Sequence, residues 1–187
     1  TVDKADQVEI LDSPPWDSSI DLSNHVADVE LRDLVTGPSR VGVSTKGVVA
    51  SVREDCGVIM RRTQCRRVLK DGVCSEPQCD TYSGNQDIRL RLVIDDGKAT
   101  SSLLINKDAT LELLGVSEDD IVSEIGSNGQ MEFVQSLRNK LLGRQVVASG
   151  RVIVDEQGAM ILAEKAELVN LDPALTATEI RAKWGVV

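Results

Sequence analysis

Alternation of apolar and polar positions predicts three consecutive strands near the start of the chain. Residues 41–53 alternate and then become rich in β-branched side chains, and Gly47 within them indicates a bulge or a sharp bend. Residues 87–94 alternate cleanly. Residues 95–97 read Asp-Asp-Gly, which predicts a hairpin turn because Asp-Gly supplies the positive φ angles that such a turn needs. Residues 99–105 then form the returning strand.

The pattern changes to a helical period after residue 105. A first helix is capped by Asn106 or Asp108, and Gly115 ends it. Residues 117–120 place acidic side chains in the first turn of a second helical segment. Residues 131–142 have the apolar spacing of a third, amphipathic helix.

Two more strands are predicted at residues 145–154 and 160–169, joined by a turn at 155–158. The chain therefore has five strands, with helices between the third and the fourth, and no alternating strand–helix units. This is the plan of an OB-fold, a small Greek-key barrel whose surface commonly holds oligonucleotides. We expect an all-β core formed by a five-stranded OB-fold barrel.

The segments outside this barrel divide the chain into three parts. Residues 1–24 are polar and contain two prolines, which indicates a linker or tail. Residues 25–170 form the OB-fold domain, entered through a short helix or an extended segment at 24–34. Residues 171–187 hold a C-terminal helix whose apolar side chains either bind a partner or pack on the barrel itself. These side chains are Leu175, Ile180 and Trp184.

Composition narrows the class of protein. The 187 residues are 41% hydrophobic and 27% charged, as in ordinary globular domains, and so few are aromatic that the core must be aliphatic. There is no apolar run near eighteen residues and no signal peptide, so we expect a cytoplasmic protein that does not bind membranes. The chain opens on Thr1 rather than Met, and we expect it to be a piece of a longer protein.

All four cysteines lie in one segment, residues 56–79, between the first two predicted strands. Disulfides would suit a secreted protein and zinc an intracellular one. Without a signal peptide we favour zinc, held in a zinc-ribbon-like insert. The alternative is a loop without metal. The candidate ligands are Cys56, Cys65, Cys74 and Cys79.

A cationic strip in the same segment suggests a polyanionic partner, although the net charge of the chain is -9. Residues 60–70 hold five basic side chains and no acidic one, so the local field there is positive. A single-strand binder needs such a field and flat side chains for base stacking. The alternative is a solvated surface. The candidate DNA-binding residues are Arg61, Arg62, Arg66, Arg67, Lys70, Arg89, Arg91 and Lys98, with Tyr82 as the stacking platform.

Catalysis finds little support in the sequence. There is a single histidine, His25, and no glycine-rich phosphate loop. The Asp-Asp pairs at residues 95–96 and 119–120 lie in a turn and at a helix start, where aspartate is expected for structural reasons. We therefore expect a protein that is not an enzyme.

Several stretches of the chain resemble the zinc-bearing OB-fold domain of replication protein A large subunits, and the archaeal versions are the most similar. The resemblance extends over about residues 30 to 170. The stretches that carry it are 47–57, 65–74, 87–97, 105–115 and 141–152. The resemblance implies single-stranded DNA binding in replication, repair and recombination. It also implies assembly with other replication protein A subunits through the C-terminal helix, and contacts with replication and repair proteins near the nucleoid.

The cysteine spacing departs from the family's pattern, which has two close pairs of ligands. Cys65 would be the second ligand of the first pair, but residues 61–63 are Arg-Arg-Thr, and none of these binds zinc well. Cys74 and Cys79 would form the second pair. Either Cys56 is the fourth ligand, or the zinc site is incomplete.

Overall fold

We describe the fold from a computed structural model of the chain. It describes residues 12, 26–65, 67–69, 73–74, 84–156, 158–170 and 172–185. Seven strands are found in these ranges: β1 (Ala27–Asp28), β2 (Arg40–Val52), β3 (Gly57–Arg62), β4 (Gly84–Asp95), β5 (Thr100–Ile105), β6 (Gln145–Asp155) and β7 (Gly158–Leu168).

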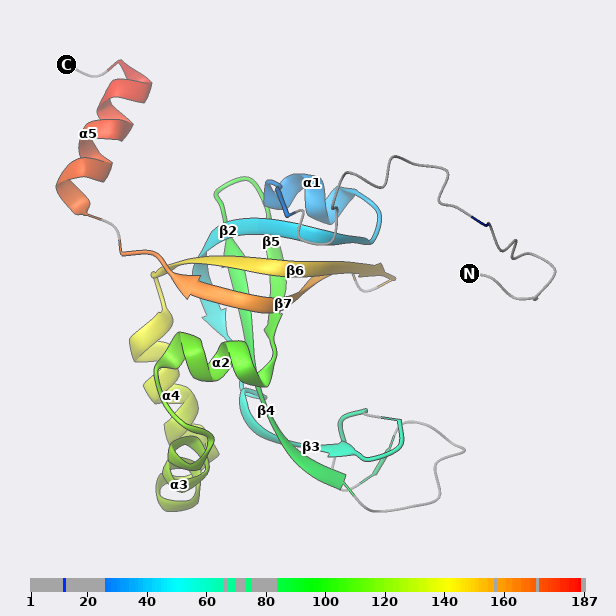
Figure 1. Cartoon of the computed structure of the whole chain (residues 1–187). Helices are drawn as coiled ribbons and strands as arrows, with labels where there is room; N and C mark the ends of the chain where they lie inside the picture. Colours follow the sequence, from blue (N-terminus) through cyan, green and yellow to red (C-terminus); the bar gives the residue numbers. More distant parts are fainter. Residues whose placement is uncertain are drawn as a thin grey trace.

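The seven strands belong to one sheet in the order β1-β2-β6-β7-β5-β4-β3, and β2 also pairs with β4. Pairing therefore runs from β2 through β6, β7, β5 and β4 and returns to β2. β1 with β2 and β5 with β7 are parallel pairs, and the other pairs are antiparallel. β3 pairs only with the first half of β4, and this hairpin extends away from the rest of the sheet (Figure 1).

Five helices accompany the sheet in the described part of the chain: α1 (Leu31–Thr36), α2 (Lys107–Leu114), α3 (Glu118–Asn128), α4 (Gln130–Leu141) and α5 (Pro173–Trp184). Of the two predicted caps for α2, Asn106 is the residue used, since its side chain accepts a hydrogen bond from the Ala109 N–H. Ser117 and Asp120 form a capping box at the start of α3. No helix in the described ranges has both the length and the apolar character needed to cross a membrane.

The core consists of inward-facing residues of the strands together with buried residues of the helices that cover them. On β4, the alternate residues Ile88, Leu90, Leu92 and Ile94 are fully buried. Leu31 and Leu34 of α1 cover one end of this core, while Phe133, Val134, Leu137 and Leu141 of α4 cover another part. Each such side chain stabilises the fold by about 1.5–3 kcal/mol through burial.

The structure adds elements that the sequence pattern did not predict. β1 and β3 are further strands, and the basic run is partly a strand, because β3 covers Gly57–Arg62 and turns back to an isolated bridge between Arg61 and Val68. The lead-in at 24–34, predicted as a short helix or an extended segment, contains the short strand β1 and the start of the helix α1, which extends to Thr36.

The sequence predicts a bulge or a sharp bend at Gly47, and the bulge lies elsewhere. The register of β2 shifts between Val49 and Ser51, while Gly47 lies where β2 passes from β6 to β4. A Cβ atom on Gly47 would lie 3.1 Å from the Asp95 carbonyl oxygen, so the close approach of β4 explains this glycine.

Candidate nucleic-acid interface

The outer face of β4 carries two arginines that share one carboxylate. Arg89 and Arg91 alternate with the buried leucines, as the sequence predicts, and both guanidinium groups pair with Oδ2 of Asp55. The Arg91 Nη1–Asp55 Oδ2 distance is 3.2 Å, and Arg89 Nε also donates to the Asp55 main-chain oxygen at 3.2 Å. Burial lowers the pKa of Arg89, and the Asp55 carboxylate partly offsets this. Arginine stays charged at any physiological pH, so the cluster has fixed charges.

The turn that carries Asp55 is fixed on two sides. On the β4 side, Cys56 Sγ accepts from the Arg91 N–H at 3.1 Å and lies 3.2 Å from the Arg91 main-chain oxygen, to which it donates. On the α4 side, the Gln130 side-chain amide donates to the Cys56 main-chain oxygen. Gly57 follows with φ +97, where a Cβ would lie 3.0 Å from Phe133. Asp55 is therefore held in a defined place.

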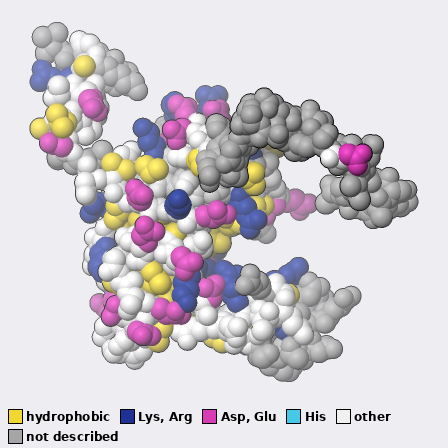
Figure 2. Space-filling view, in the orientation of Figure 1, with side chains coloured by type: hydrophobic (Ala, Val, Ile, Leu, Met, Phe, Trp, Pro, Cys, Tyr) yellow, Lys and Arg dark blue, Asp and Glu magenta, His cyan; other side chains and the backbone are white. Residues whose placement is uncertain are grey.

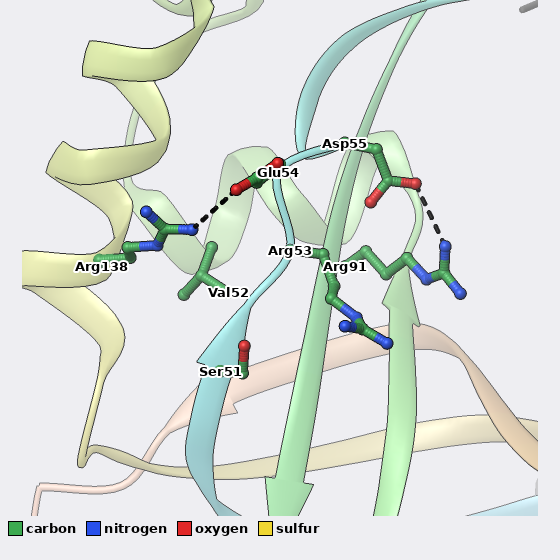
Figure 3. A pocket seen from close by; sticks show the side chains of 7 residues that line it. All are labelled: Ser51, Val52, Arg53, Glu54, Asp55, Arg91 and Arg138. Atoms are coloured by element: carbon green, nitrogen blue, oxygen red, sulfur yellow. Dashed lines mark hydrogen bonds and ion pairs between the residues drawn. The ribbon is translucent and has the colours of Figure 1, made fainter.

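A shallow cleft of about 490 Å³ lies beside this turn. Arg53, Arg91 and Arg138 supply its positive charge, and Glu54 and Asp55 its negative charge. Arg53 directly follows β2 and Arg91 lies on β4, whereas Arg138 extends from α4 and pairs with Glu54 at 3.8 Å (Figure 3). The Arg53 N–H donates to the Arg91 main-chain oxygen at 2.9 Å, which keeps the two residues adjacent.

Sequence reasoning missed Arg53 and Arg138 as candidates. Arg53 is the last residue of the strand pattern at 41–53, so its position at the polar end of a strand was an available signal. Arg138 gives no such signal, because nothing in the spacing of α4 shows that its arginine lies opposite residues 53–55. Acidic and basic side chains are interspersed over the face seen in Figure 2, and the cleft has the same mixed character.

The basic run of the insert is only partly at the surface. Arg61 is ion-paired with Asp87 of β4. Arg62, another predicted DNA-binding residue, is buried, with 3% of its surface exposed. Arg67 is exposed. The other candidates in this segment, Arg66, Lys70 and Tyr82, lie outside the described residues.

Lys98 lies at the far end of β4 from the β3 hairpin. Its Nζ is 2.7 Å from both carboxylate oxygens of Glu30, next to α1. The hydrogen bond and the charge of Glu30 raise the pKa of Lys98. The structure therefore does not place Lys98 among the cleft residues.

The structure separates the four cysteines into two environments. Cys56 is fully buried in the core, and burial raises the pKa of its thiol to about 11. Cys65 and Cys74 lie in the insert with their sulfur atoms 3.6 Å apart, much farther than the roughly 2.05 Å of a disulfide. Within the described residues, Cys56 forms no metal-sized cluster with these two, and Cys79 lies outside those residues.

The sulfur positions of Cys65 and Cys74 fit a shared metal ion. Two thiolates bound to one tetrahedral zinc, each at about 2.3 Å, lie about 3.8 Å from each other. The observed 3.6 Å is close to that value. Cys56 does not fit the same site, because its protonated thiol already donates to Arg91 in the core. The other ligands would come from elsewhere in the insert.

The C-terminal helix α5 stands away from the body of the protein (Figure 1). Asp172 caps it by accepting from the Ala174 and Leu175 N–H groups. Leu175, one of the predicted partner-binding residues, is 64% exposed. The side chains of the other two, Ile180 and Trp184, lie outside the described part of the chain.

Comparison with known proteins gives a result for the fold alone. No family model matches the chain, and no curated protein matches it. A chain of a replication protein A heterotrimer bound to single-stranded DNA is similar, with a TM-score of 0.54 and 12% identity, over 84% of this chain and 39% of that one. A chain of yeast replication protein A bound to single-stranded DNA has a TM-score of 0.45 and 18% identity, over 76% of this chain and 84% of that one. A chain of the S. pombe Stn1–Ten1 complex has a TM-score of 0.37 and 11% identity, over 87% of this chain and 89% of that one.

The first of these similarities shows that the chain has an OB-fold-like architecture, a mostly-β sheet with helices. The chain spans about two fifths of the length of that replication protein A chain.

Proposed function

We propose that this chain binds single-stranded DNA within a complex similar to replication protein A, in replication, repair and recombination. In this proposal β2, β4, β5, β7 and β6 form an OB-fold barrel. β4 is then the second barrel strand, and residues 53–83 connect the first and second strands. OB-folds bind oligonucleotides on the face of strands two and three and in the connection between strands one and two.

The observation that supports this function most is the position of the arginine cleft. Arg91 lies on β4, Arg53 at the start of the connection, and Arg138 on the opposite wall. With Arg89, four arginines face two carboxylates, which leaves an excess of two positive charges in a chain whose net charge is -9. Guanidinium groups suit phosphates because they donate two parallel hydrogen bonds. Leu104, which pairs with Arg91 across β4 and β5, offers an aliphatic surface for a base.

Binding of a fluorescent single-stranded oligonucleotide to purified protein tests the proposal. Replacing Arg53 by Gln removes an exposed charge from the cleft, and we expect affinity to fall about fivefold, which corresponds to roughly 1 kcal/mol. Lys165→Gln on β7 removes the same charge from an exposed site outside the cleft, and we expect less than a twofold change. Equal losses in both variants would argue against a specific cleft.

Zinc is part of the same proposal. Cys65 and Cys74 would hold the ion together with Cys79, and a zinc thiolate cluster would hold the insert in one conformation. Cys56 is left out of the ligand set because of its place in the core. Metal content of the purified protein, with and without Cys65→Ser, tests this. A metal-free wild-type protein that still binds DNA would remove zinc from the proposal and leave the cleft untouched.

A second function, assembly with other subunits, is favoured by α5. A helix that stands apart from the body with Leu175 largely exposed suits a protein–protein interface. Removal of the residues after Pro173 should leave DNA binding within twofold and abolish association with partner subunits. If DNA binding falls with the truncation, the helix belongs to the DNA-binding surface instead.

A further inference from the structure

The Asp55 carboxylate pairs with two arginines of β4 at once. Its Oδ2 accepts from the guanidinium groups of both Arg89 and Arg91, and two arginines on a single oxyanion are an arrangement typical of phosphate recognition. We propose that the Asp55 carboxylate competes with the DNA phosphate for these arginines and thereby sets the affinity of the cleft. This inference rests on the proposed function and concerns the same site.

The Asp55 carboxylate can rotate away from Arg89 and Arg91 while these two arginines keep their positions. The Asp55 side chain is 40% exposed, so rotation carries it into solvent. Arg89 remains fixed, because its Nε donates to the Asp55 main-chain oxygen and its side chain is only 14% exposed. Arg91 remains fixed at its backbone by the Cys56 thiol. The arginine positions thus do not depend on the carboxylate alone.

The main chain around Asp55 cannot move with the same ease. Gln130 holds the Cys56 main-chain oxygen from α4, and Gly57 packs closely against Phe133. Exchange of carboxylate for phosphate therefore involves the Asp55 side chain rather than the turn. Binding then costs the loss of two existing ion pairs, which lowers the net gain from each new phosphate contact.

The charge of the cleft is consistent with a competitor. With Asp55 present, the three arginines that line the cleft and the adjacent Arg89 are accompanied by two carboxylates, those of Glu54 and Asp55. Without the Asp55 charge they face only Glu54, whose pairing with Arg138 is long, at 3.8 Å. The local excess of positive charge then rises from two to three, and a polyanion is attracted more strongly.

The test is Asp55→Asn, which keeps the size of the side chain and removes its charge. We expect affinity for a single-stranded oligonucleotide at low salt to rise about threefold to tenfold, in the range of one surface ion pair. Glu167→Gln, at an exposed position of β7, changes the net charge of the protein by the same amount outside the cleft, and we expect it to change affinity less than twofold. Asp55→Ser, measured in parallel, provides a second neutral variant if the asparagine variant does not fold.

The possible outcomes separate this inference from the proposed function. If Asp55→Asn is folded, as judged by its melting temperature, and binds DNA more weakly than wild type, Asp55 orients the arginines and the inference is overturned. Unchanged affinity also overturns it. If wild type, Asp55→Asn and Arg53→Gln all bind equally, the inference is overturned and the cleft is not the DNA site, although the chain still binds DNA. If none of the three binds DNA, the proposed function itself fails.

Discussion

At the scale of single residues, Cys56 shows that a cysteine close in sequence to other cysteines can serve a purpose other than metal binding. Its sulfur bridges the main chain of Arg91, on the neighbouring strand, from inside the core. A thiol in this place is a small apolar side chain with one donor and one acceptor. It connects the buried core directly to the arginine pair on the outer face.

The free energy of unfolding should therefore depend on pH through ionisation of the Cys56 thiol. Burial raises its pKa from the ordinary 9.0 to about 11, so the folded protein favours the protonated thiol. That contribution is fully present below pH 9 and is lost as the pH rises toward 11, by roughly 1.4 kcal/mol per pH unit in this window. Urea unfolding of wild type and Cys56→Ala at pH 7, 9 and 10 measures it.

The alanine variant should be less stable at pH 7 by about 1–3 kcal/mol, through lost packing and hydrogen bonds. Because it has no thiol to ionise, the difference from wild type should shrink between pH 9 and 10. Parallel losses of stability in the two proteins would show that Cys56 is not the group responsible.

At the scale of elements, Gly150 illustrates a constraint on the β6–β7 pair. The register of this pair shifts between Ser149 and Gly150, and a Cβ on Gly150 would lie 2.1 Å from the Leu162 carbonyl oxygen. Backbone oxygen cannot yield as a flexible side chain can, so the strands would have to separate. We expect Gly150→Ala to lower the free energy of unfolding by roughly 2–4 kcal/mol.

Gly126 provides the matched control for this substitution. It lies within α3, and a Cβ there would meet nothing within 4 Å. Gly126→Ala should leave the protein unchanged or stabilise it by up to about 1 kcal/mol, since alanine is the better helix former. Denaturant unfolding of both variants gives the comparison. A Gly150→Ala variant as stable as wild type would mean that the two strands are not closely paired at this point.

Most elements could be predicted because their signals are local. The alternation at residues 87–94, the Asp-Gly turn and the cap at Asn106 each depend on a few neighbouring residues, and β4, its turn and α2 appear accordingly. β3 was missed because its basic residues interrupt the apolar alternation. Its partner, the start of β4, lies more than twenty residues later in the chain.

At the scale of the whole molecule, the order of strands and helices could be predicted, but the site could not. Arg89 and Arg91 were found because strand alternation places them on the outer face. Their pairing with Asp55, the burial of Arg62 and the approach of Arg138 depend on contacts across distant elements. No periodic pattern in the sequence encodes such contacts. Counting basic residues therefore overestimated the exposed positive charge of the insert and missed Arg53 and Arg138 of the cleft.

The net charge of the molecule and the charge of the cleft have opposite signs, and salt titration separates their effects. If three arginines of the cleft contact phosphates, the logarithm of the binding constant should fall with the logarithm of the salt concentration with a slope near –2, about –0.7 per contact for single strands. Arg53→Gln should make this slope less steep by about 0.7, whereas Lys165→Gln should leave it as it is. An affinity independent of salt would contradict phosphate contacts by the cleft. A steep slope that neither variant alters would place the contacts on other basic residues of the chain.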